Sequence, residues 1–229
     1  KLFNIPAISH CEDEDLSKGF VHEGGASVIS GIEPIPAIAE EIIVKRDMTI
    51  AKYVKTPIHL THISTKGSVE SIGEMKKKYD LITCDTCPHY FTLTDRATLS
   101  FDTNTKVNPP LRSKEDVKAI KEGLREEIID IIATDHAPHD LTSKDVEFDI
   151  ASSGISGLET ALGLSMALVH EGVLSMSMLI KKFTETPAQL LNLPYGGLAH
   201  GDAADIIVFD PDYEWTVDKN NFVSKGKNT

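Results

Sequence analysis

The chain has 229 residues, 41% hydrophobic and 25% charged, which is the composition of an ordinary globular protein long enough to bury one large core. Its formal net charge of −12 argues against an extended nucleic-acid-binding surface, because such surfaces use Lys and Arg to neutralise phosphates. No apolar run approaches the roughly 18 residues that cross a bilayer, and the first residues show no signal-peptide pattern. These features predict a cytoplasmic protein that binds neither nucleic acid nor membrane.

The three cysteines are Cys11, Cys84 and Cys87, and an odd number cannot close a disulfide framework, which fits a reducing compartment. Cys84 and Cys87 form a C-x-x-C pair. A structural zinc site needs two further ligands, and the sequence holds no second pair of this kind. We therefore expect two half-buried thiols on a strand rather than a zinc-binding pair.

Short apolar runs alternate with amphipathic segments along most of the chain, which is typical of βαβ units and a parallel sheet. The apolar run at 128–134 is continuous, so this strand should be buried on both faces. Ser113 is expected to cap a helix with an acidic first turn. The expected elements, in chain order, are a strand at 5–9, a helix at 35–54, a strand at 57–63, a helix at 69–79, a strand at 81–84, the helix after Ser113, a strand at 128–134, helices at 157–171, 176–184 and 187–193, and two outlying strands at 204–210 and 215–217.

Each of the four main strands delivers a histidine or an aspartate at or just beyond its C-terminal end. In a (β/α)₈ barrel the active site lies at that end of the strands, so residues far apart in sequence converge there. Imidazole and carboxylate are ligands that zinc accepts, and catalytic zinc sites keep one position open for water. The pattern therefore predicts a metal site, on four βα units that make up half of such a barrel. The residues are His10, His62, His89 and Asp135.

Four motifs stand along the chain in a fixed order: His10-Cys11-Glu12-Asp13, His62-Ile63-Ser64-Thr65-Lys66, Asn108-Pro109-Pro110-Leu111-Arg112 and Ala133-Thr134-Asp135-His136-Ala137-Pro138-His139. Together they resemble the dihydroorotases of the amidohydrolase superfamily, in the bacterial and archaeal type with a two-metal site. The resemblance covers essentially the whole chain and extends through 153–155 to 224–229. It implies an α/β fold, with the C-terminal half of a (β/α)₈ barrel at 1–195 and part of a small β-sandwich unit at 196–229.

The resemblance also implies roles for particular residues. His10 and His62 would bind the second metal, and Asp135 would contact the first metal and transfer a proton. Asn108, His139 and the backbone near Ser153 and Gly154 would hold the substrate. The implied cofactor is Zn²⁺, one or two per chain. The implied reaction is the reversible hydrolysis of dihydroorotate to N-carbamoyl-L-aspartate in pyrimidine biosynthesis. The implied partners are a second copy in a homodimer or aspartate transcarbamoylase.

Three features of that family have no counterpart ahead of the first strand of this sequence: a His-x-His, an arginine for the substrate carboxylate and a bridging carboxylate. Two explanations compete. Either the chain is the retained part of a longer protein, or it is a natural relative that has lost catalysis. The first is favoured, because half a barrel would leave sheet edges exposed that proteins normally close or cover.

Structural interpretations of the same residues stay open. His10 alone could be a core histidine bonded to a carbonyl, and Asp135 could cap a turn. Asn108, which precedes two prolines, could belong to a rigid turn that also holds its amide for a ligand. His59 and His62 lie three residues apart on one expected strand, so alternation should place one in the barrel and the other facing outward. We expect His89 to be structural or to support a ligand residue.

Competing functions also stay open. Allantoinase and dihydropyrimidinase share the barrel and the metals, although the Asn108 motif combined with His139 favours a substrate that carries a carboxylate. An inactive, metal-free scaffold for a transcarbamoylase partner is a different class of function, and retention of His10, His62 and Asp135 weighs against it. The segment between the last site motif and Ser153 could close over substrate or be an ordinary surface loop.

Overall fold

The computed structural model describes residues 5–194 and 198–229. Four parallel strands form one sheet in the order β1-β4-β5-β6, and helices connect them. The elements of this main unit are β1 (Ala7–His10), α2 (Ile38–Val54), β4 (Ile58–Thr61), α3 (Lys66–Lys76), β5 (Ile82–Thr86), α4 (Pro88–Thr92), α5 (Lys114–Arg125), β6 (Ile131–Ile132), α6 (Ala161–His170), α7 (Met176–Phe183) and α8 (Glu185–Leu190). The alternation expected from the sequence is confirmed.

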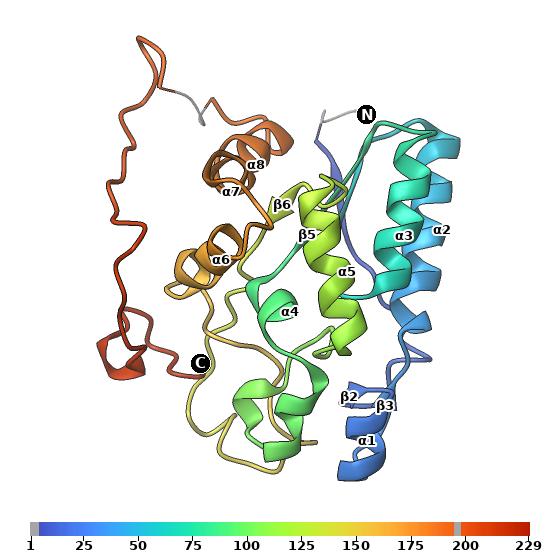
Figure 1. The fold of residues 1–229 in the computed structure, drawn as a ribbon. Coiled ribbons are helices and arrows are strands. Elements are labelled where there is room, and N and C mark those ends of the chain that lie inside the picture. The colour runs from blue at the N-terminus through green and yellow to red at the C-terminus, as the bar shows by residue number, and fades with distance from the viewer. Residues whose placement is uncertain (1–4, 195–197) are drawn as a thin grey trace.

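The two faces of the sheet differ in chemistry. Side chains alternate along a strand, so Ile58 and Leu60 of β4 point to one face and His59 and Thr61 to the other. Ile58 and Leu60 belong to a buried apolar core that also contains residues of α2, α3, α5 and α7. Helices α2, α3 and α5 stand side by side against the strands, and α6, α7 and α8 lie beyond β6 (Figure 1). The other face, which carries His59 and Thr61, is therefore the one available for the predicted metal site.

Two expectations about local structure are confirmed. Ser113 caps α5: its Oγ accepts from the Asp116 N–H, and the Asp116 carboxylate accepts from the Ser113 N–H. Strand β6 is buried on both faces, although it spans only two residues of the expected 128–134. The cysteines of the C-x-x-C pair are fully buried rather than half-buried, and only Cys84 lies on a strand.

Short elements that the sequence pattern did not reveal surround the site end of the sheet. They have too few residues to show a hydrophobic period, so propensity alone could not indicate them. They are β2 (Val21–His22), α1 (Gly25–Ser30), β3 (Pro34–Ile35), the 3₁₀ helices η1 (Asp95–Ser100) and η2 (Thr103–Thr105), and, near the C-terminus, η3 (Lys219–Asn221).

The two outlying strands are not formed. The chain at 204–210 and 215–217 runs without a hydrogen-bonded neighbour strand along the outside of α6, drawn in red in Figure 1. A strand needs a partner for its backbone groups, and the described residues supply none there. Ile207 and Val208 are 75% and 96% exposed. The apolar side chains that indicated a strand are therefore present, but they are not buried against a partner strand. The expected boundary at 195/196 lies outside the described residues, and the separate β unit stays a prediction.

No helix within the described residues combines the length and the apolar character needed to cross a membrane.

Candidate metal and substrate site

The carboxyl ends of the four strands bring polar side chains together at one edge of the sheet. His10 is the last residue of β1, His62 directly follows β4, and Asp85 is the penultimate residue of β5. Asp135 follows β6 after a short turn. Parallel strands carry their carboxyl ends on the same side, so this convergence follows from the topology.

The three residues expected to bind metal lie close together. The imidazole rings of His10 and His62 have centroids 5.8 Å apart and stand almost perpendicular, at 85°. Nε2 of His62 lies 3.8 Å from Oδ1 of Asp135. The sequence-based expectation that these side chains share one region of the molecule agrees with this geometry. What they bind is a separate question.

Both His62 and Asp135 have left-handed backbone conformations, with φ of 61° and 44°. This region costs L-residues other than glycine free energy, and such residues concentrate at functional sites where the surroundings enforce them. The other described non-glycine residues with positive φ stand just after helices: Lys55, Phe101, Glu127 and Asn192. Within 5–194 and 198–229, His62 and Asp135 are the two non-glycine residues that adopt this conformation shortly after a strand.

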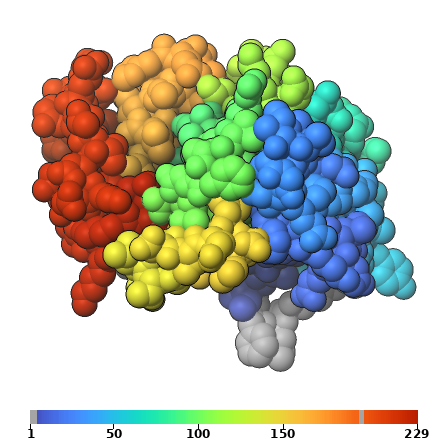
Figure 2. Space-filling view, turned by 90° about the horizontal axis from the view of Figure 1, so that it is seen from below, coloured from blue at the N-terminus to red at the C-terminus, as the bar shows by residue number. Residues whose placement is uncertain are grey.

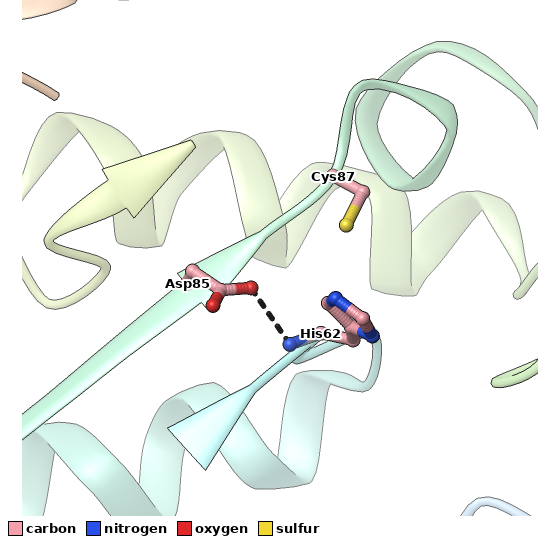
Figure 3. A group of neighbouring side chains, drawn as sticks. All are labelled: His62, Asp85 and Cys87. Carbon is pink, nitrogen blue, oxygen red and sulfur yellow. Dashed lines mark hydrogen bonds between the residues drawn. The ribbon is translucent and has the colours of Figure 1, made fainter. Parts of the chain in front are cut away.

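The carboxylate of Asp85 holds the backbone of His62 in place. It accepts hydrogen bonds from the His62 N–H at 2.8 Å and from Oγ1 of Thr61 at 2.7 Å, and it pairs with Nε2 of His59 at 2.8 Å. Figure 3 shows the bond from Asp85 to the His62 backbone. The expectation that His59 or His62 packs outward is wrong, because His62 lies beyond the end of β4, where alternation no longer applies, and His59 is 2% exposed on the polar face.

One group among the described residues has its possible ligand atoms all within 4.8 Å of one another: His62, Asp85 and Cys87, drawn in Figure 3. Two of them are poorly prepared to hold a cation. Both oxygens of Asp85 already accept hydrogen bonds. Burial raises the pKa of the Cys87 thiol well above its usual range, whereas the thiolate is the form that binds metals.

His62 and Asp135 are spaced as two ligands of a metal ion would be. The 3.8 Å between Nε2 of His62 and Oδ1 of Asp135 is too long for a hydrogen bond. Two ligand atoms on one tetrahedral zinc stand about 3.4 Å apart, given metal–ligand distances of about 2.0–2.2 Å. In addition, Nδ1 of His62 is buried and has no hydrogen-bond partner among the described residues. The spacing of Nε2 of His62 and Oδ1 of Asp135 fits two ligand atoms of one metal ion, and Nδ1 is the ring nitrogen that does not face Asp135.

Asp135 is also placed to handle protons. Burial raises the pKa of its carboxyl above the usual range, while His62 and His10 lower it and Asp85 raises it. His89 lies fully buried behind these residues, and burial together with His62 lowers its pKa to about 3, so its imidazole is neutral near pH 7. This agrees with the structural alternative expected for His89, whose Nε2 finds no partner among the described residues.

The residues expected to bind substrate fall into two groups. Asn108 stands beside the residues expected to bind metal. Its Nδ2 donates to Oε2 of Glu12 at 2.9 Å, and the same oxygen lies 3.8 Å from Nδ1 of His10. His139, Ser153 and Gly154 form the second group. Nε2 of His139 pairs with the Ser153 carbonyl oxygen at 2.9 Å.

Gly154 is a position where only glycine fits. Its φ is 140°, and a Cβ there would lie 2.5 Å from Cβ of Ala137 and 3.0 Å from Nε2 of His139. The close approach lets the segment after β6 run beside residues 153–156, with the Ala137 N–H donating to the Ile155 carbonyl.

Asn228 ties these segments together, a role that was not assigned to it from the sequence. Its Nδ2 donates to the carbonyls of Ala137 and Gly154, while its Oδ1 accepts from the His139 N–H and the Ser156 hydroxyl. Asn228 and Asp85 carry no pattern that a single sequence reveals, because their roles arise only from contacts between distant segments.

The model of the amidohydrolase family matches residues 40–229. A dihydroorotase from Syntrophus aciditrophicus is 51% identical over 223 residues, covering 97% of this chain and 52% of that protein. A dihydroorotase from Acetivibrio thermocellus is 50% identical over 230 residues, covering 100% and 54%. The chain thus spans about half the length of the curated relatives it matches.

Solved structures share the fold. A dihydropyrimidinase from Brevibacillus agri superposes with a TM-score of 0.82 at 21% identity, covering 93% of this chain and 49% of that one. An L-hydantoinase (dihydropyrimidinase) from Arthrobacter aurescens does so with a TM-score of 0.81 at 25% identity, with the same coverage. The expected fold class, half of a (β/α)₈-type barrel, is confirmed.

Proposed function

The chain belongs to the amidohydrolase family, and we propose that it forms part of a dihydroorotase, which interconverts dihydroorotate and N-carbamoyl-L-aspartate. The observation that carries this proposal is the identity of about half of all residues with curated dihydroorotases over nearly the whole chain. The hydantoinase-type structures with the same fold are far less similar in sequence, at 21% and 25% identity.

The metal in this proposal is zinc, held by His10, His62 and Asp135. When bound, zinc polarises the carbonyl of the cyclic amide and makes a water molecule more acidic. The proximity of the three side chains supports their assignment.

Asp135 is the proton carrier in the proposed reaction. Hydrolysis adds one water across the ring C–N bond, so the oxygen ends on the carbonyl carbon and one hydrogen ends on the departing nitrogen. The Asp135 carboxylate accepts that hydrogen from the attacking water and delivers it to the ring nitrogen, which must be protonated to leave. Ring closure follows the same path in reverse.

The substrate residues in the proposal are Asn108, His139, Ser153 and Gly154. His139 is assigned to the substrate carboxylate, and the backbone of Ser153 and Gly154 to the polar edge of the ring. The contacts among His139, Ser153 and Gly154 support one continuous wall for this purpose. A neutral ring, such as that of a dihydropyrimidinase substrate, would leave His139 without its partner.

The test is an assay of the complete gene product, loaded with zinc, on dihydroorotate, dihydrouracil and allantoin. We expect turnover of dihydroorotate to exceed that of the two neutral rings at least about a hundredfold, because a site built for a charged group rejects analogues that lack it. Preference for either neutral ring, or no turnover of dihydroorotate by the zinc-loaded protein, would overturn the proposal.

A further inference from the structure

The loop of residues 140–152 connects His139 to Ser153 and is held from beneath by two buried lysines. In Figure 2 this loop, coloured yellow, lies across the face seen from below, beside the green segment that contains η2. Its inward side chains are Lys144, Phe148 and Ala151, which are 5%, 6% and 3% exposed. Leu141 and Ile150, in contrast, are 77% and 69% exposed, so the loop has a buried and an open side.

Lys144 binds both the loop and its neighbour. Its Nζ donates to the carbonyl of Thr103, in η2, and to the carbonyl of Ser152, each at 2.7 Å. The Thr103 hydroxyl returns a bond of 2.5 Å to the Lys144 carbonyl. Lys144 therefore fixes Ser152, the residue directly before Ser153, against Thr103, which lies 41 positions before Lys144 in the chain.

Lys106 forms the second attachment. Its Nζ donates to the Asp149 carbonyl at 2.7 Å and stands 4.6 Å from the centre of the Phe20 ring. Its backbone carbonyl accepts from the Gly154 N–H at 2.8 Å. Lys106 lies two residues before Asn108. The same segment therefore carries one proposed substrate residue, Asn108, and contacts another, Gly154.

Buried ammonium groups are costly unless they are hydrogen-bonded. Neither lysine forms an ion pair with a carboxylate among the described residues; the acceptors of both Nζ atoms are backbone carbonyls. Burial lowers the pKa of Lys144 to about 8, and Lys106 contributes to this. Because the Nζ atom of Lys144 is satisfied by carbonyls of two separate segments, the arrangement indicates a positioning role.

We propose that Lys144 is a positioning residue for substrate binding: by joining Ser152 to Thr103 it sets the distance between the Ser153–Gly154 wall and Asn108. The proposal rests on the assignment of those residues to the substrate in the function proposed above. It makes the loop a fixed support of the site rather than a cover that closes over substrate.

The test compares Lys144→Met with Lys144→Arg in the complete, zinc-loaded gene product. Methionine keeps the length and packing but cannot donate, whereas arginine retains donors. Lys118→Met, at an exposed position of α5, is the matched control. Two quantities are measured: hydrogen exchange of the amides of 140–154, and KM and kcat for dihydroorotate.

We expect Lys144→Met to speed exchange across 140–154 and raise KM about tenfold, with kcat within about threefold, because loss of ground-state positioning acts on binding. Lys144→Arg should recover part of both effects, and Lys118→Met should resemble the wild type. Unchanged exchange, or a fall in kcat at unchanged KM, would overturn the positioning role. Absence of dihydroorotate turnover in the wild type would instead overturn the proposed function, and the exchange measurement would still decide whether Lys144 holds the loop.

Discussion

The carboxylate of Asp85 accepts a hydrogen bond from the backbone N–H of His62, one strand away, and so supports a residue with a left-handed backbone. Ligand histidines are usually oriented through the other ring nitrogen. Here Nδ1 of His62 has no partner among the described residues, so the ring is placed through its backbone instead. Asp85 thereby links the rigid sheet to the proposed metal site.

We expect Asp85→Ala to weaken zinc binding by about 10–100-fold, the usual cost of losing a residue that orients a ligand. Asp85→Asn is the matched control, because its amide oxygen can still accept from the His62 N–H. Titration of the complete gene product with a competing chelator measures the affinity. Equal affinities for the alanine and wild-type proteins would show that Asp85 does not place His62.

Asp135→Asn should keep the fold and lose turnover by about 10²–10⁴-fold, since an amide cannot accept and return a proton. The measurement is kcat for dihydroorotate together with the thermal unfolding midpoint. A variant with near-normal kcat would remove Asp135 from the proton-transfer role.

Asn228→Ala should destabilise the protein by about 2 kcal/mol or more, because several buried donors and acceptors lose their partner at once. It should also raise KM, since the His139 and Gly154 segments separate. Asn220→Ala, at an exposed position, should change stability by no more than about 0.5 kcal/mol. Urea unfolding measures the stability of both variants. Equal stabilities of Asn228→Ala and Asn220→Ala would contradict the proposed role of Asn228 in joining the segments.

His89 should make the protein sensitive to acid. Its pKa is about 3 in the folded chain and about 6.5 when unfolded, so between these values the unfolded state binds the extra proton. Stability should therefore fall as the pH drops from 6.5 toward 3, by about 2 kcal/mol at pH 5 from this group alone. In His89→Phe that part of the decline should be missing. Urea unfolding of the wild type and of His89→Phe at pH 7 and pH 5 measures how far the stability of each protein falls. An identical fall in both would show that His89 is not the cause of the acid sensitivity.

The sequence predicted the four main strands, their parallel arrangement and the residues at their carboxyl ends, because burial and parallel topology leave a clear pattern. Residues 58–60 and 131–132 show this: apolar side chains mark the buried strands, and the polar residues that follow mark the site edge. The cap at Ser113 was predictable for the same reason, since its chemistry is local.

What the sequence missed depends on contacts between distant segments. The roles of Asp85, Asn228 and Lys144 arise from bonds across 23 to 91 positions, and no local pattern indicates them. The error at His59 has a related cause, because the left-handed turn at His62 interrupts the alternation on which the prediction relied.

The central claim is that His10, His62 and Asp135 are metal ligands. Anomalous X-ray scattering from crystals of the complete gene product grown with zinc tests it most directly. We predict that a ring nitrogen of each histidine and an oxygen of Asp135 each lie about 2.0–2.2 Å from a zinc peak. A peak on Asp85 and Cys87 instead, or zinc bound away from all three residues, would contradict the claim.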